Sequence, residues 1–356
     1  MTTAATTPAA AACDRMLARF ERRYRAEVEE VALRLLAVPS SSRLARPKRW
    51  LLEPLAFTLE RRRSFFRAGF TLTAAESAGQ REAGPFLAAA IEIGWTCALV
   101  LDDVFDVADE REGHPAAHRV FGLGRAFAAV AAAQLVLLAT LLFRTPQPLG
   151  TRLRVTWSGI GVVLRGFRSQ LPSRQRPPPL ERYAQRGWEA NMTSVWTMTA
   201  PLVGRVDRGT LRAVRSCARL MCANGKFRND LLDYCGGSSE NDSVLVDFEG
   251  RRITLPAIVA LEQADDPADR RRLEEHFRVR RGRAMTATDG VAVMARHDTI
   301  ARCVELIRAN ARRAADDAAV IGRDWPSGSA LTSLMHDWAL AWAEAAAERA
   351  GAPSAG

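Results

Sequence analysis

Two acidic clusters, each following a long run of residues with helical periodicity, carry the side chains best suited to chemistry in this sequence. The first is Asp102-Asp103-Val104-Phe105-Asp106, and the second is Asn229-Asp230-Leu231-Leu232-Asp233. The first and last residues of each cluster are four apart and so share one face of a helix. Like charges one turn apart destabilise a helix unless a cation binds between them, and carboxylate oxygens suit Mg²⁺. The predicted metal ligands are Asp102, Asp103, Asp106, Asn229, Asp230 and Asp233, and all of them except Asp230 are also predicted to be catalytic.

The first cluster has a simpler alternative, which is an acidic helix end exposed to solvent. Acidic side chains are stabilised at the first turn of a helix by the macrodipole, but these lie toward the C-terminal end of the apolar run. Charge in that position is stabilised by a bound cation. The placement therefore favours a metal site over a solvated surface.

The composition indicates an all-α protein. Hydrophobic residues make up 48% of the 356 residues and aromatic residues only 7%, and clear alternating strand patterns are hard to find. Length alone suggests two domains, but we predict a single domain over residues 13–350, between a disordered N-terminal tail, 1–12, and a C-terminal tail, 351–356. Helices are predicted at 13–37, 64–80, 84–108, 118–143, 150–171, 179–203, 207–235, 251–263, 267–283, 290–320 and 327–350.

The net charge of +10 comes almost wholly from arginine, because Lys48 and Lys226 are the only lysines. A basic balance is compatible with nucleic acid, an anionic membrane or a phosphorylated substrate. The arginine runs at 61–63, 270–272 and 278–283 lack the interleaved aromatic residues of a nucleic-acid platform. We therefore predict no nucleic-acid partner.

The cysteines and the apolar segments indicate a cytoplasmic protein. Six cysteines show no CxxC spacing and no secretory signal precedes them, which is typical of reduced thiols inside the cell. The segment from Ala126 to Phe143 is apolar enough to just span a bilayer. Because alanine is weakly hydrophobic and no second segment of this kind is found, we predict a central helix of a bundle and no stable membrane span.

The sequence around the two clusters resembles the trans-isoprenyl diphosphate synthases and the class I terpene synthases that share their fold. The first cluster is followed by Arg-x-Gly-x-Pro-x-x-His-x-x-Phe-Gly at Arg111 to Gly122, and the second by Thr254-Leu255-Pro256. The resemblance covers roughly residues 63 to 262. It implies a helical bundle around a deep apolar cavity, with the two clusters facing each other at its mouth and three Mg²⁺ ions bridging them to an allylic diphosphate.

Several residues depart from the pattern of elongating synthases, which bind isopentenyl diphosphate at a second anion site. The family's lysine and first arginine positions hold Ser64 and Phe65, while the last arginine remains as Arg67. Trp95 replaces a histidine, and Glu112 replaces the second arginine of a pair after the first cluster. These exchanges move the local charge by about four units toward negative. A second diphosphate is then repelled unless the arginines at 61–63 compensate.

The resemblance also implies which residues bind the diphosphate and line the cavity. The predicted diphosphate-binding residues are Arg111, Lys226, Arg252 and Arg186, with Arg182 as an alternative to Arg186. The predicted cavity residues are Trp95, Cys97, Ala98, Met192, Thr193 and Trp196, where Met192 replaces a family lysine. The last ligand position of the second motif holds Gly237, which cannot bind a metal, and Glu240 or Asp242 is the alternative.

These observations favour a class I terpene synthase, which would ionise geranylgeranyl or farnesyl diphosphate with Mg²⁺ and guide the cation to a cyclic terpene. The first alternative is an elongating prenyltransferase, supported by Arg67, Thr193, Asp233 and Arg252. The second is a non-catalytic regulatory subunit of a heteromeric prenyl synthase. The predicted partner is a small prenyl diphosphate, and the sequence is compatible with a homodimer.

Overall fold

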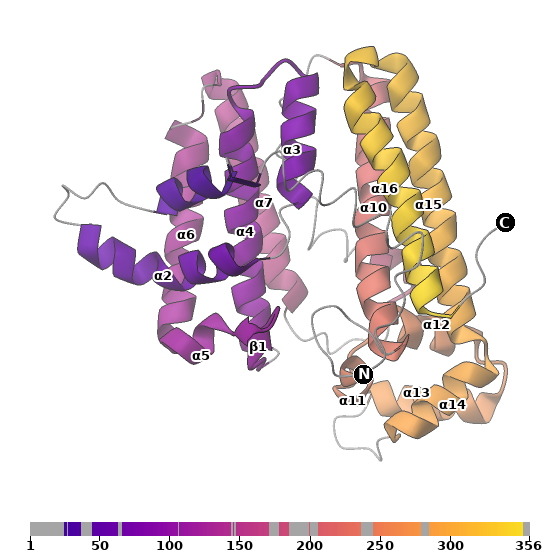
Figure 1. Cartoon of the computed structure of the whole chain (residues 1–356). Helices are drawn as coiled ribbons and strands as arrows, with labels where there is room; N and C mark the ends of the chain where they lie inside the picture. The colour runs from indigo at the N-terminus through magenta and orange to yellow at the C-terminus, as the bar shows by residue number, and fades with distance from the viewer. Residues whose placement is uncertain are drawn as a thin grey trace.

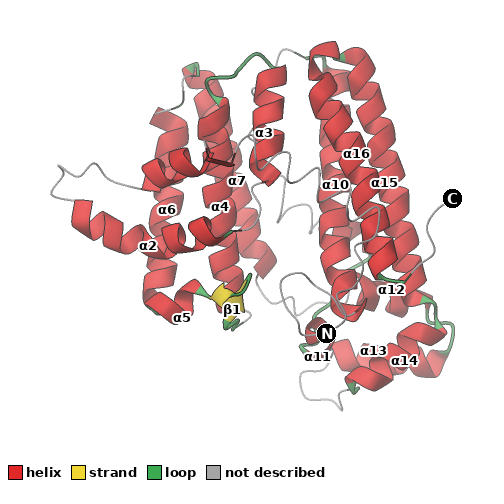
Figure 2. Ribbon diagram, in the orientation of Figure 1, coloured by secondary structure: helices red, strands yellow, loops and turns green. Residues whose placement is uncertain are grey.

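The computed structural model describes residues 25–26, 28–36, 45–62, 66–105, 107–143, 145, 147–170, 178–184, 199, 206–235, 245–278 and 285–351. Within these ranges almost all regular structure is helical, and Figure 2 shows one small strand feature among the helices. The prediction of an all-α fold is confirmed. The tail predicted at 1–12 lies outside the described ranges, and so does the tail predicted at 351–356 apart from its first residue.

The helices carry these labels and bounds: α2 Ala45–Arg61, α3 Phe66–Ser77, α4 Gly84–Phe105, α5 Ala117–Phe121, α6 Leu123–Phe143, α7 Leu149–Gln170, α10 Arg208–Cys235, α11 Val246–Glu249, α12 Leu255–Gln263, α13 Pro267–Arg278, α14 Ala287–Arg296, α15 Thr299–Asp324 and α16 Ser329–Arg349. A 3₁₀ helix, η1 Pro326–Gly328, joins α15 to α16. The strands β1 Glu110–Arg111 and β2 His114–Pro115 pair antiparallel. Helical residues also occur at 28–36 and 180–184.

The helices form two groups with α3 between them (Figure 1). One group contains α2, α4, α5, α6 and α7, in which α6 packs against α2, α4 and α7. The other contains α10, α12, α15 and α16, in which α10 packs against α15 and α16. Helix α3 contacts both α4 and α16. Helix α3 therefore joins the two groups.

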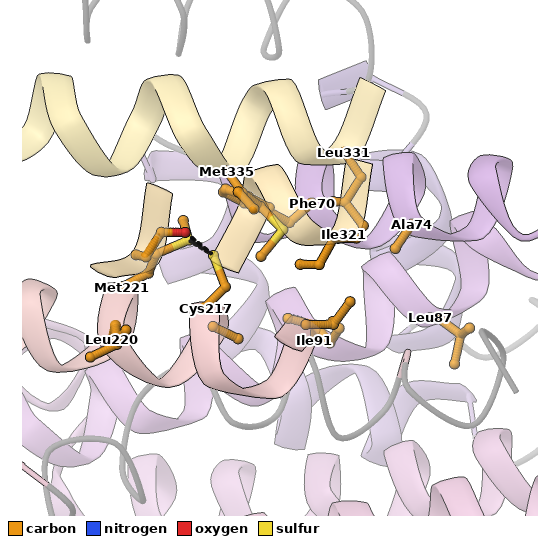
Figure 3. Close-up of a cluster of buried hydrophobic side chains, with 14 of the residues drawn as sticks. Phe70, Ala74, Leu87, Ile91, Cys217, Leu220, Met221, Ile321, Leu331 and Met335 are labelled. Carbon is orange, nitrogen blue, oxygen red and sulfur yellow. Dashed lines mark hydrogen bonds between the residues drawn. The ribbon is translucent and has the colours of Figure 1, made fainter. Parts of the chain in front are cut away.

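A cluster of buried apolar side chains joins the two groups at the ends of α4 and α10 that lie away from the acidic residues (Figure 3). Phe70 and Ala74 from α3 meet Ile91 from α4, Met221 from α10 and Met335 from α16 in this cluster. Burial of such side chains is the main favourable term in folding. The C-terminal part of α10 instead packs Phe227 and Leu231 into a separate cluster with α12, α15 and α16.

A buried ion pair ties the connection between α2 and α3 to α4. Glu92 is the single charged residue in the apolar run of α4 before Asp102, and its Oε2 lies 2.6 Å from Nη1 of Arg62. Both side chains are buried, and the backbone N–H of Ala68 donates to Glu92 Oε1 at 2.8 Å. A buried carboxylate needs such partners. Glu92 thus fixes the start of α3 against α4.

One helix that was not predicted and two breaks within predicted helices have local reasons. Helix α2 was not predicted, because Pro54 inside it hides the period of the buried Leu55 and Leu59. The helix predicted at 118–143 is broken at Gly122, whose φ is 84°, a conformation that glycine adopts without a steric penalty. The helix predicted at 290–320 is broken at Asp298, whose φ is 50°, into α14 and α15.

Two described helices are long and apolar enough to cross a membrane, which corrects the expectation of one. These helices are α4 and α6. In α4, 72% of an apolar 18-residue stretch is buried within the protein, whereas 39% of the corresponding stretch of α6 is buried. The burial of α4 is typical of the core helix of a bundle.

Candidate functional site

The two acidic clusters lie at the same end of the bundle, on helices from different groups. Figure 1 shows that α4 ends near β1 and that α10 ends near α11, both toward one end of the molecule. Asp102 and Asp103 lie in the last turn of α4, and Asn229, Asp230 and Asp233 lie in the last two turns of α10. Asp106 lies outside the described residues. This arrangement supports a site shared by the two clusters, although the position of Asp106 is not described.

Helix α4 ends in a turn that strains one residue. The N–H of Ala108 donates to the carbonyl of Asp103 at 2.9 Å, and the N–H of Val107 donates to that of Val104 at 3.3 Å. This pair of bonds is the Schellman pattern, which requires a left-handed residue and favours glycine there. Val107 has a φ of 54°, although β-branched residues rarely adopt this conformation. Backbone strain of this kind is concentrated at functional sites in proteins.

A two-residue hairpin holds Arg111 against the first cluster. The turn between β1 and β2 consists of Glu112 and Gly113, with φ values of 53° and 82°, as a type I′ turn requires. Arg111 Nε lies 2.5 Å from Asp103 Oδ1, and the two side chains are 17% and 2% exposed. The hairpin was not predicted, because each strand has only two residues. The hairpin turns Arg111, which the resemblance assigns to diphosphate binding, toward Asp103, which is a predicted metal ligand.

A small pocket next to this ion pair gathers charged side chains from α2, α4 and the hairpin. Its charged lining residues are Arg61, Arg62, Asp103, Arg111 and Glu112. Three arginines and two acidic residues thus line it, and an ion pair among them joins Arg111 to Asp103. Arginine gives bidentate, permanently charged contacts to phosphate oxygens. Arg61 and Arg62 thus line the pocket beside Arg111, although Arg62 already pairs with Glu92. Residue 63 lies outside the described ranges.

Trp95 does not present a bare aromatic wall, because a guanidinium covers it. Arg67 Cζ lies 3.4 Å from the centroid of the Trp95 ring, at cation–π distance. Both side chains are half-buried. Two residues on, Cys97 is buried, and burial raises the pKa of its thiol to about 12, so the thiol stays protonated. Ala98 is half-buried in the same helix turn.

In the second cluster, Asp230 is buried among three donors. Its Oδ2 accepts from the Tyr183 hydroxyl at 2.5 Å and from the Leu255 N–H at 3.0 Å. Its Oδ1 lies 2.8 Å from Lys226 Nζ, and the side chains of Asp230 and Lys226 are 1% and 36% exposed. Leu255 is the first residue of α12, where a negative charge is favourable. Asp230 therefore links α10 to Tyr183 and to α12.

The pKa shifts in this group keep the hydroxyl and the ammonium protonated. Burial raises the pKa of the Tyr183 hydroxyl, and the charge of Asp230 raises it further. Burial alone would lower the pKa of Lys226, but the adjacent Asp230 raises it well above its usual value. Burial raises the pKa of the Asp230 carboxyl, and Lys226 opposes that shift. Tyr183 was not identified from the sequence, where a tyrosine at 183 gives no sign of its partner 47 residues away.

Asp233 is bonded to the small helix α11. Its Oδ2 accepts from the Asp247 N–H at 3.1 Å, and its backbone carbonyl accepts from the Leu245 N–H at 2.8 Å. Asp247 in turn lies 3.1 Å from Arg252 Nη1, so the predicted diphosphate residue Arg252 is one carboxylate away from Asp233. Asn229 is exposed and Asp233 is half-buried. Both side chains thus have more contact with solvent than Asp230.

The buried ring of Phe248 holds α11 in place. It stacks on His276 with ring centroids 4.2 Å apart, and His276 Nε2 lies 2.9 Å from the Phe248 carbonyl oxygen. The Met285 N–H donates to His276 Nδ1, so Nε2 carries the proton. A methyl group built at Gly290 of α14 would lie 2.1 Å from the Phe248 ring, which only a glycine avoids. Helices α13 and α14 thus buttress the helix that contacts Asp233.

Several predicted site residues lie outside the described ranges: Asp106, Arg186, Met192, Thr193, Trp196, Gly237, Glu240 and Asp242. Arg182 is described and exposed. Within the part of the chain that the structure describes, no group of three or more His, Cys, Asp or Glu side chains is arranged to hold a metal ion. Asn229 is not one of these residue types, so the two-cluster metal site stays a prediction.

Solved structures with the same fold come from archaea and bacteria. A geranylgeranyl pyrophosphate synthetase from Pyrococcus horikoshii matches with a TM-score of 0.73 and 17% identity, over 91% of this chain and 98% of that one. A polyprenyl synthase from Caulobacter crescentus, complexed with calcium and isoprenyl diphosphate, matches with 0.69 and 18%, over 92% and 97%. A geranylgeranyl pyrophosphate synthase from Corynebacterium glutamicum, complexed with isoprenyl diphosphate and magnesium, matches with 0.64 and 16%, over 94% and 99%.

The family follows from the sequence itself. No curated protein sequence matches the chain. The model of the polyprenyl synthetase family, however, matches residues 48–294, which include both acidic clusters, the hairpin and the helices that position them. This stretch covers more than half of the 356 residues. The chain therefore belongs to the polyprenyl synthetase family.

Proposed function

We propose that this protein is a prenyltransferase that condenses an allylic prenyl diphosphate with isopentenyl diphosphate. The observation that carries the proposal is the family match over residues 48–294, which spans both acidic clusters. The solved structures of the same fold support it, since two of them were obtained with isoprenyl diphosphate. In the reaction the allylic C1–O bond breaks, a C–C bond to isopentenyl diphosphate forms, and a proton leaves. Chain elongation, the first alternative to terpene cyclisation, is therefore the preferred function.

The oxygen ligands proposed for magnesium are those with access to solvent. Asp102 is half-buried, Asn229 is exposed and Asp233 is half-buried, so these residues fit an ion that keeps several waters. Asp106 completes the proposed set. Magnesium would act as a Lewis acid on the departing diphosphate. Three ions remain the proposed number.

The chain's own cations would orient the diphosphates. Arg111 and Lys226 each sit beside one cluster, and Arg252 is joined to Asp233 through Asp247. Arg61 lines the pocket beside Arg111, which supports binding of a second diphosphate there, whereas the guanidinium of Arg62 is already paired with Glu92. Arg186 is proposed for the same role. The prenyl chain would lie against the remaining proposed residues, which are Trp95, Cys97, Ala98, Met192, Thr193 and Trp196.

Incubation of the purified protein with Mg²⁺, isopentenyl diphosphate and each of dimethylallyl, geranyl, farnesyl and geranylgeranyl diphosphate tests this proposal. We expect consumption of both substrates and a prenyl diphosphate longer by at least one five-carbon unit, detected by mass spectrometry. Consumption of the allylic substrate alone, with release of a phosphate-free hydrocarbon or alcohol, would refute it.

Terpene cyclisation is the second candidate, favoured by the charges in the pocket. Glu112 lines it in place of a family arginine, and Trp95 stands in place of a family histidine with Arg67 stacked on it. Both changes weaken the site for a second diphosphate. Gas chromatography of incubations without isopentenyl diphosphate tests this candidate, since a cyclase would form a cyclic product from geranylgeranyl or farnesyl diphosphate alone.

A further inference from the structure

Two arginines at either end of the connection between α2 and α3 dock on the same helix, α4, within one turn of each other. Arg62 is buried, and its Nη1 lies 2.6 Å from Glu92 Oε2. Arg67, in the first turn of α3, lies over the ring of Trp95, with its Cζ 3.4 Å from the ring centroid. One arginine is therefore held by a carboxylate and the other by an aromatic ring.

These two ways of holding a guanidinium have different electrostatic consequences. The carboxylate of Glu92 neutralises the charge of Arg62 and accepts one of its N–H bonds. A ring carries no net charge and contacts only the flat face of a guanidinium, whose five N–H bonds point outward in the plane of the group. Flat groups in contact are about 3.5 Å apart, so Arg67 lies face to face with Trp95. The stack thus fixes the orientation of Arg67 without neutralising its charge.

The main chain beside Arg67 is fixed by the same helix that carries Trp95. The N–H of Ala68 donates to Glu92 Oε1 at 2.8 Å, and Glu92 is itself held by Arg62. Ala68 and Glu92 are both buried. Helix α4 therefore positions both the backbone at the start of α3 and the guanidinium of Arg67.

The stacked pair lies on the side of α4 that carries Asp102. Trp95 and Asp102 are seven residues apart, so they share a face of the helix and are separated by about 10 Å along its axis. Trp95 and Arg67 are both half-buried, so neither is sealed in the core. A guanidinium held in one orientation binds a phosphate group through two N–H bonds at a small cost in side-chain entropy. The position therefore fits a second diphosphate beside one bound at Asp102.

We propose that Trp95 is a positioning residue whose ring holds Arg67 in the orientation that binds the diphosphate of isopentenyl diphosphate. The inference rests on the proposed function, because it concerns the non-allylic substrate of that reaction. Loss of the family histidine at position 95 weakens the anion site, and the stack offsets part of that loss by fixing a permanently charged group. Stacking occupies one face of the indole, so this role is compatible with a place in the cavity wall.

Steady-state kinetics with both substrates varied tests the inference, because it separates the two KM values. Trp95→Leu keeps an apolar side chain and removes the ring. We expect it to raise the KM for isopentenyl diphosphate about tenfold and to change the KM for the allylic diphosphate by less than about twofold. Trp95→Phe keeps a ring and should raise the KM for isopentenyl diphosphate by no more than about threefold.

Arg67→Lys keeps the charge but removes the planar group that stacks, so it remains informative if Trp95→Leu fails to fold. It should raise the KM for isopentenyl diphosphate about tenfold, as Trp95→Leu does. In an Arg67→Gln background, Trp95→Leu should change this KM by less than about twofold, because the residue that Trp95 positions is gone.

A second arginine–tryptophan stack, which the candidate site does not include, provides a matched control. Arg125 of α6 lies over the ring of Trp50 of α2, with its Cζ 4.4 Å from the ring centroid. Trp50→Leu removes the same kind of contact and should leave both KM values within about twofold of those of the unmodified protein.

Three results would overturn the inference. They are an unchanged KM for isopentenyl diphosphate in Trp95→Leu, an equal rise in both KM values, and an equal effect of Trp95→Leu with and without Arg67. Failure of the proposed function looks different in calorimetric titration with isopentenyl diphosphate alone, which needs no turnover. If the unmodified protein binds it more tightly than Trp95→Leu does but never forms a longer prenyl diphosphate, the function fails and the inference stands. No binding by the unmodified protein would overturn both.

Discussion

The two acidic clusters place a cation beside a buried carboxylate by different local means. At the end of α4, Arg111 reaches Asp103 from a hairpin eight residues further along the chain. At the end of α10, Lys226 reaches Asp230 from one turn earlier on the same helix. Asp230 is also fixed by Tyr183 and α12, so the second ion pair is supported by two segments besides α10. Two different backbone arrangements thus produce the same pairing of a buried carboxylate with a basic side chain.

The backbone that follows the clusters is more alike than the ion pairs. After α11, the Arg252 N–H donates to the Asp247 carbonyl and the Arg251 N–H to that of Phe248, the same Schellman pattern that ends α4. Arg251 has a φ of 55°, as Val107 has 54°. Among the described residues, four of the five non-glycine positions with positive φ follow the two clusters. Strain has therefore been retained beside the candidate site and is rare elsewhere in the described chain.

Loss of the first residue of a cluster should have the largest effect on activity. Asp102→Ala should lower turnover at least about 100-fold, because a Mg²⁺ ligand contributes several kcal/mol to stabilising the departing diphosphate. Asp109→Ala, which removes an exposed carboxylate in the following turn, is the control and should leave turnover within about twofold. Steady-state kinetics with the allylic diphosphate measures both. Normal turnover by Asp102→Ala would refute the metal assignment.

Stability should separate Asp102 from its neighbour. Asp103→Ala should lower the free energy of unfolding by about 3 kcal/mol, because it leaves the largely buried Arg111 without its carboxylate. Asp102→Ala should change it by less than about 0.5 kcal/mol, since removing like-charge crowding costs little. Urea denaturation followed by circular dichroism measures the difference. Equal values for the two variants would mean that the division within the cluster is wrong.

The support of the second cluster should weaken in mild acid. Burial lowers the pKa of His276 below its usual value of 6.5. Below about pH 6.5 the unfolded chain therefore takes up a proton that the folded protein binds less tightly, so this contribution to stability is present above that pH and is lost as the pH falls. Unfolding free energies between pH 5 and 7.5 should fall less steeply for His276→Gln than for the unmodified protein. Parallel curves would contradict the assignment.

The smallest effect is expected at the strained turns. Val107→Gly should raise the free energy of unfolding by up to about 1 kcal/mol, because Val107 is 66% exposed and its branched side chain opposes a positive φ. Asp298→Gly is the control and should gain less, since aspartate tolerates the left-handed conformation better than valine. Thermal unfolding followed by calorimetry compares them. A loss of stability for Val107→Gly would show that the turn is held by contacts rather than strained.

Periodicity sufficed for the helices that carry the clusters. The helix predicted at 207–235 is observed as Arg208–Cys235, and the helix predicted at 84–108 as Gly84–Phe105. Both runs are long and end at acidic residues, so their existence and direction are strongly specified. The family was also foreseen, because two spaced acidic motifs and a downstream Thr-Leu-Pro occur together in few proteins.

The partners within the site could not be predicted in the same way. Spacing places Lys226 one turn before Asp230 and Asn229 one turn before Asp233, so both pairs were open to the same interpretation. Burial separates them, and burial depends on Tyr183 and Leu255, which are distant in sequence. The hairpin at Arg111 was missed because two-residue strands carry no period. The local sequence pattern specifies which residues share a face of a helix. The neighbouring helices determine which of those residues are buried.

The contact between Gly290 and Phe248 makes the second cluster sensitive to a distant part of the chain. Any side chain at position 290 would displace the Phe248 ring, which also stacks on His276. The displaced ring would carry the Asp247 N–H away from Asp233. Glycine at position 290, 57 positions after Asp233, therefore determines where the acidic end of α10 can lie. Relatives with a bulkier residue at position 290 would need a smaller side chain at position 248.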